Sequence, residues 1–80
     1  MRKLKLIWDF RGPVGQKTAE HHLIHLKEYI ESNALDITIT GVETFSDMHS
    51  LAYLVVDESE MKHIRDILKP HRGQVFSKES

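Results

Sequence analysis

Residues 46–56, SDMHSLAYLVV, join a polar turn to the clearest strand in the chain. Small polar residues such as those in SDMHS favour a turn, and the apolar run LAYLVV (51–56) has the length of a buried strand. The segment before the turn, DITIT (36–40), alternates and is rich in β-branched residues, which predicts a second strand. We expect a bulge at Gly41, after which VETF (42–45) continues or bends that strand. Together these segments predict a hairpin.

The N-terminal segment LKLIWDF (4–10) has the two-residue period of a strand. One face would carry Leu4, Leu6, Trp8 and Phe10, and the other Lys5, Ile7 and Asp9. RGPVG (11–15) is typical of a loop.

A helix is predicted to begin between Pro13 and Thr18 and to end near Ser32, with Asn33 in a left-handed cap conformation. Its apolar stripe has helical spacing and consists of Ala19, Leu23, Leu26 and Ile30.

The C-terminal part predicts one more helix and one more strand. Ser59 is expected to cap the helix EMKHIRDILK (60–69), which would turn Met61, Ile64 and Leu68 inward. Pro70 and Gly73 should end it. A short last strand is predicted around Gln74–Ser77.

The resulting order, β–α–β–β–α–β, resembles the ferredoxin-like fold over the whole chain. The length of 80 residues predicts a single domain over residues 1–80. The resemblance implies class α+β, with two helices that cover one face of a four-stranded antiparallel sheet. The uncovered face should include Ile7, Thr38, Thr40 and either Leu51, Tyr53 and Val55 or the alternate residues of that strand. Because this face is rich in apolar residues and the core is small, we expect a homodimer, although long lysine stems covering the patch are an alternative.

Composition and charge exclude several classes of function. A net charge of −1 offers no basic excess for nucleic acid, and the absence of cysteine removes disulfide and thiolate chemistry. The N-terminus has no signal-peptide pattern, and no apolar run reaches membrane-spanning length. We therefore expect a soluble cytoplasmic protein that binds neither nucleic acid nor membrane.

Motifs of several ferredoxin-like families are missing. HSLAYLVV (49–56) has one tyrosine but no basic residue of the kind that RNA-recognition modules carry on this strand. The loop RGPVG (11–15) has no CxxC motif of the metal-chaperone type. FRGPVGQK (10–17) has an arginine and glycines, but not in the order found in acylphosphatases. The resemblance therefore extends to the fold and implies no particular activity.

Unusual residues gather in four segments that the predicted topology brings to one edge of the sheet: WDFRG (8–12), TAEHH (18–22), SDMH (46–49) and KPHRG (69–73). His63 lies away from this edge, and the turns at the opposite edge of the sheet carry no candidate residues. The candidate ligand-binding residues are Trp8, Arg11, His22, His25, Asp47, His49, His71 and Arg72.

A divalent metal ion is one candidate ligand, with His22, His25, His49 and His71 as candidate donors. His25 lies three residues from His22 and four from His21, and either pair could hold a metal across one helical turn. We favour His22, since His21 should point outward. The alternatives are a boundary histidine that binds a loop carbonyl, or a histidine that responds to pH.

A small anion is the second candidate, because Arg11 and Arg72 lie near the N-terminus of the first helix. The alternative is that these arginines pair with Asp9 or Asp47. A third possibility is acid–base catalysis, in which Asp9 would orient His22, His49 or His71 as a general base. Asp9 could instead cap the loop that follows it.

The leading hypothesis is a homodimer that binds a small anionic ligand or a metal ion at this edge. The alternatives are an enzyme for proton transfer or isomerisation, and an interaction module without a ligand.

Overall fold

The computed structural model describes residues 2–37 and 39–76 of the chain. The elements are β1 (Lys3–Arg11), α1 (Gly15–Ser32), β2 (Thr40–Ser46), β3 (His49–Asp57), α2 (Glu58–Leu68) and β4 (Arg72–Phe76). The α+β class with four strands and two helices is confirmed, and β4 is one of the strands. Ser77, where the last strand was predicted to end, lies outside the described residues.

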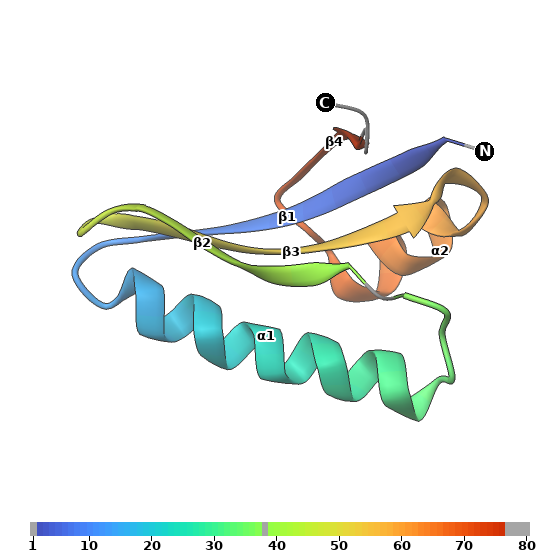
Figure 1. The fold of residues 1–80 in the computed structure, drawn as a ribbon, viewed down its shortest axis with the longest axis horizontal. Helices are drawn as coiled ribbons and strands as arrows, with labels where there is room; N and C mark the ends of the chain where they lie inside the picture. The colour runs from blue at the N-terminus through green and yellow to red at the C-terminus, as the bar shows by residue number, and fades with distance from the viewer. Residues whose placement is uncertain (1, 38, 77–80) are drawn as a thin grey trace.

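The four strands form one sheet in the order β2-β3-β1-β4, and every neighbouring pair is antiparallel. Figure 1 shows the two helices beside this sheet, with α1 running along its length. Ala19 and Leu26 of α1 join Ile64 of α2 in one buried cluster, so both helices pack on the same side. We call this side the helix face and the opposite side the open face.

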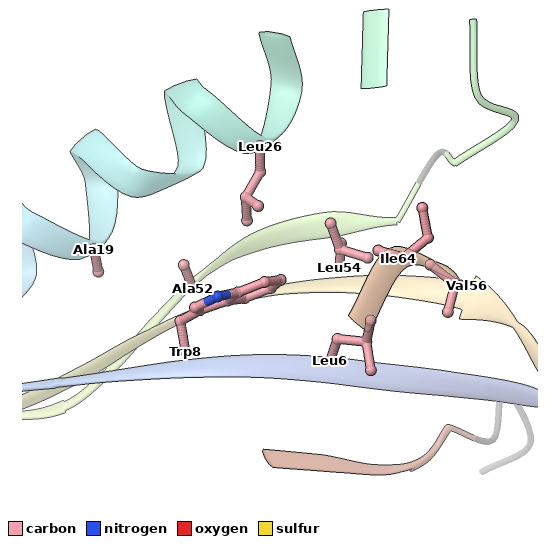
Figure 2. Close-up of a cluster of buried hydrophobic side chains, with 8 residues drawn as sticks. All are labelled: Leu6, Trp8, Ala19, Leu26, Ala52, Leu54, Val56 and Ile64. Atoms are coloured by element: carbon pink, nitrogen blue, oxygen red, sulfur yellow. The ribbon is translucent and has the colours of Figure 1, made fainter. Parts of the chain in front are cut away.

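The core lies between the helices and the helix face. Figure 2 shows Trp8 extended along the sheet beneath α1, with Ala52 and Leu54 beside it. Each of these side chains is almost fully buried. Because a strand alternates its side chains, Leu6 and Trp8 enter this core, while Ile7 and Asp9 project to the open face.

The open face is covered by its own side chains although no helix packs on it. Ile7, Leu51 and Val55 are 1%, 2% and 5% exposed. The ammonium of Lys5 lies 4.3 Å from the centroid of the ring of Tyr53, which is the cross-strand neighbour of Ile7. The same ammonium lies 3.2 Å from a carboxylate oxygen of Glu43. Long polar side chains thus shield the apolar layer from water.

The predicted start of the first hairpin strand was wrong. β2 begins at Thr40 rather than at Asp36, because pairing with β3 determines where the strand forms. Thr40 lies opposite the core residue Leu54 and so belongs to the helix face, not the open face. Thr38, also expected on the open face, lies outside the described residues.

The predicted bulge at Gly41 was also wrong. The register shifts between Thr44 and Ser46, whereas Gly41 pairs regularly with Tyr53. A Cβ atom at Gly41 would lie 2.9 Å from the Tyr53 hydroxyl. The glycine therefore gives the tyrosine ring room to lie across the strand.

Two helix caps differ from expectation. Asn33 has a φ of −104° and its side-chain amide donates to the Tyr29 carbonyl, while Ala34 takes the left-handed conformation with a φ of 52°. The second helix begins at Glu58, so Asp57 rather than Ser59 is its N-cap. Asp57 makes no capping hydrogen bond, because its carboxylate binds Lys3 on the neighbouring strand. Within the described residues, neither helix is both long and apolar enough to cross a membrane.

Candidate functional site

The four segments that carry the unusual residues do lie close together. Arg11 at the end of β1 pairs with His49 at the start of β3, and the amide of Gly12 donates to the Met48 carbonyl at 2.8 Å. His71, just before β4, donates its amide to the Ile7 carbonyl at 2.9 Å. The sheet, however, separates the side chains into two groups.

The first group lies on the open face and centres on the Asp9 carboxylate. His49 Nε2 lies 2.9 Å from Asp9 Oδ1, and Arg72 donates to Oδ2 from Nε at 2.8 Å and to Oδ1 from Nη2 at 3.2 Å. The side chains of Asp9 and His49 are 17% and 20% exposed. One carboxylate thus links β1 to both of its neighbours, β3 and β4.

These contacts stabilise the charged forms of Asp9 and Arg72. The hydrogen bond from Arg72, and after it that from His49, hold the pKa of Asp9 well below its usual range, although burial opposes this. The same bond to Asp9 raises the pKa of Arg72. Asp9 neutralises the charge of Arg72, so Arg72 is not free to bind an external anion. This agrees with the alternative in which Arg72 pairs with Asp9.

The second group lies on the helix face. The His22 ring packs on Trp8 and Phe10, with ring centroids 5.0 and 5.5 Å apart. Trp8 donates from its indole nitrogen to the Leu68 carbonyl at 3.1 Å. His22 Nε2 is buried and has no hydrogen-bond partner among the described residues. Burial, followed by the nearby His25, His71 and His21, lowers the pKa of His22.

Replacing His22 with leucine is expected to raise the free energy of unfolding by about 1 kcal/mol at pH 7.5, because it removes a buried nitrogen without a partner. The gain should increase at pH 5.5. The unfolded chain takes up the His22 proton first as pH falls, since the folded-state pKa is lowered, and only the wild type loses stability in this way. Urea denaturation at both pH values measures the effect. His63→Leu, at an exposed position on α2, should change little, and an equal gain there would contradict the interpretation.

His71 is held by the backbone of β1. Its Nδ1 accepts a hydrogen bond of 2.9 Å from the Asp9 amide, so Nδ1 carries no proton. Its ring centroid lies 6.2 Å from that of Phe10. His71 therefore belongs to the helix-face group and does not contact the Asp9 carboxylate that was considered as its orienting partner.

The other candidates are dispersed. Arg11 and Asp47 are exposed, at the end of β1 and in the turn between β2 and β3. His25 is exposed on α1, where its Nε2 lies 3.1 Å from Nε2 of His21. The four candidate metal donors do not form one ligand set, because His49 lies across the sheet from His22. No group of three or more histidine, aspartate or glutamate side chains within residues 2–37 and 39–76 is arranged to hold a metal ion.

A groove that the sequence analysis missed lies between α2 and β4. It has a volume of about 430 Å³, and its walls include Leu4, Leu6, Met61, Arg65, His71 and Val75. Gly73 also lines it, opposite Leu6 on the helix face of the sheet. The sequence pattern indicated a role for Gly73 only in ending the second helix. Its position in an edge strand leaves a space beside α2 that a larger side chain would fill.

The structure thus has a charged group on the open face, an aromatic and histidine group on the helix face, and an apolar groove beside the second group. Pro70 and His71 connect the groove to that group. No protein-family model matches the chain, and searches of curated proteins and of solved structures find no match.

Proposed function

We propose that the groove between α2 and β4 binds a small amphipathic anion, such as a carboxylate on an apolar body. The observation that supports this most directly is the groove itself. Its volume of about 430 Å³ is within the range of small-molecule sites, roughly 300–1,000 Å³. Leu4, Leu6 and Met61 supply apolar walls, and burial of an apolar ligand against them would provide most of the affinity.

The sign of the ligand charge follows from Arg65 and His71. Arg65 is half-exposed, and its contact with the adjacent Asp66 is long, 3.5 Å, so this exposed pair holds the guanidinium weakly. His71 accepts at Nδ1, which leaves the proton on Nε2 and makes that nitrogen a donor. An arginine and an imidazole N–H beside an apolar groove suit a carboxylate.

Acid–base catalysis by Asp9 and His49 is the alternative, supported by their separation of 2.9 Å. The geometry favours it less, because Arg72 binds both oxygens of the carboxylate and lowers its basicity. The group then connects three strands and needs no substrate to explain its contacts.

We also infer that the architecture is ferredoxin-like. The element order and the two central strands, β1 and β3, support this. The homodimer stays a prediction. One chain already covers the apolar residues of its open face, so a second copy would gain more by pairing backbone groups along the edge strands β2 or β4 than by packing on that face.

Gly73→Val is expected to abolish binding of the groove ligand. A Cβ at this position would lie 3.4 Å from the Leu6 side chain, an ordinary contact, and Gly73 does not have a positive φ, so valine fills the groove without backbone strain. Sodium octanoate serves as the probe, and the melting temperature as the readout. A ligand at ten times its Kd adds about 1.4 kcal/mol of stability, or roughly 6–11 °C for a domain of this size.

The matched control is Thr44→Val, at an exposed position on the other edge strand, β2, which does not line the groove. It should keep the octanoate shift that Gly73→Val loses. Arg65→Gln should reduce the shift with octanoate but not the smaller shift with uncharged octanamide. If octanoate stabilises Gly73→Val as much as the wild type, or does not stabilise the wild type at all, the proposal is wrong.

A further inference from the structure

The exposed histidines of α1 form a close pair that belongs to neither group described above. His21 and His25 lie one helical turn apart, with Nε2 atoms separated by 3.1 Å and ring planes 78° apart. Both side chains reach solvent. When both imidazoles are neutral, only one hydrogen can lie between the two Nε2 atoms, so one Nε2 donates it and the other accepts it.

The separation of 3.1 Å matches what a metal chelate requires. Zinc binds imidazole nitrogen at about 2.0–2.1 Å, so two nitrogens at octahedral or tetrahedral angles around one ion lie roughly 2.9–3.4 Å apart. The two Nε2 atoms already fall within that range. A cation could therefore bind both Nε2 atoms without a change in the α1 backbone, with the shared hydrogen moving to Nδ1 of the ring that carries it.

Glu28 supports the same orientation of His25. Its Oε1 lies 3.6 Å from His25 Nδ1, one turn further along the helix. That distance is too long for a hydrogen bond, but a carboxylate at this nitrogen favours a proton there and leaves Nε2 free to bind a cation. Histidines that bind metals commonly have such a partner on the second ring nitrogen.

We propose that His21 and His25 chelate a late first-row divalent cation, such as Ni²⁺, Cu²⁺ or Zn²⁺, on the exposed side of α1. Imidazole nitrogen suits these ions, and water completes their coordination because the described residues provide no third ligating side chain at the pair. His22, between the two in sequence, takes no part, since its Nε2 is buried against Trp8 and Phe10. The site is separate from the groove and does not depend on the proposed ligand.

The test is a titration of the metal-free protein at pH 7.5, with NiCl₂ followed by calorimetry and with diamagnetic ZnCl₂ followed by the imidazole ¹⁵N resonances. We expect one equivalent of either ion to bind, and Zn²⁺ to shift the Nε2 signals of His21 and His25. Either single alanine variant should weaken binding at least tenfold. Alanine is the best helix former and both positions are exposed, so the variants should fold, which circular dichroism verifies.

His63→Ala is the matched control, because it removes an exposed histidine from the other helix. It should bind Ni²⁺ like the wild type. Glu28→Gln should weaken binding by no more than about tenfold, the low end of the effect of an outer partner. Binding that survives in His21→Ala or His25→Ala, is lost in His63→Ala, or shifts the His22 signals first would overturn the proposal.

Discussion

Replacing Trp8 with alanine is expected to remove about 3–5 kcal/mol from the free energy of unfolding. Trp8 is 3% exposed, lies under α1 and contacts the ring of His22. Its indole nitrogen also binds the Leu68 carbonyl at the end of α2, so one side chain fixes both helices to β1. A chain of 80 residues has a total stability of roughly 4–12 kcal/mol, and the variant should be near its unfolding threshold at 37 °C.

Guanidinium denaturation followed by circular dichroism measures the loss. Trp8→Phe, which keeps an aromatic ring of smaller size but not the hydrogen bond, should cost less than the alanine variant. Phe45→Ala removes an aromatic side chain that is 60% exposed and should cost about 0.5 kcal/mol or less. Equal losses for Trp8→Ala and Phe45→Ala would show that the tryptophan does not organise the core.

Asp9→Asn is expected to cost about 2 kcal/mol at pH 7, because it weakens charged hydrogen bonds to both Arg72 and His49. The cost should depend on pH. The folded-state pKa of Asp9 lies below its unfolded-state value, about 3.9, so the unfolded chain binds the proton first as pH falls. The stabilisation by Asp9 is fully present above about pH 5 and disappears progressively below pH 4.

Urea denaturation of both proteins at pH 7, 4 and 2.5 gives the difference in unfolding free energy at each pH. That difference should be clearly smaller at pH 2.5 than at pH 7, because by then the carboxyl is protonated in the unfolded chain and still largely ionised in the folded protein. Asp47→Asn, in the exposed turn between β2 and β3, should stay within about 0.5 kcal/mol of the wild type throughout. A difference for Asp9→Asn that is the same at pH 2.5 as at pH 7 would exclude a carboxylate-based role.

Local pattern was sufficient for the elements whose burial follows a simple period. The alternation of Leu4, Leu6 and Trp8 predicted β1, and the spacing of Ala19 and Leu26 predicted α1. The start of β2 could not be predicted in this way, since residues 36–40 have the pattern of a strand but the strand that pairs with β3 begins only at Thr40. Long-range pairing overrides local preference at such boundaries.

The separation of the candidate site into two groups follows from the two-residue period of β1. The strand period already put Trp8 and Asp9 on opposite faces, which means that Asp9 cannot meet a histidine that packs on Trp8. Chain topology brought the segments to one edge, whereas side-chain direction decided which residues meet. The groove was harder to predict, because it depends on how α2 lies relative to β4 and on the missing side chain of Gly73.

The central position of β1 has a consequence for how this protein is made. β1 is synthesised before the other three strands, yet its neighbours are β3, which ends at Asp57, and β4, which begins at Arg72. β1 therefore has no pairing partner until β3 has been made, and Asp9 can meet Arg72 only after β4 has begun. Such distant pairings slow folding. During translation, the apolar residues of β1 depend on being kept from other chains until the second half of the protein emerges.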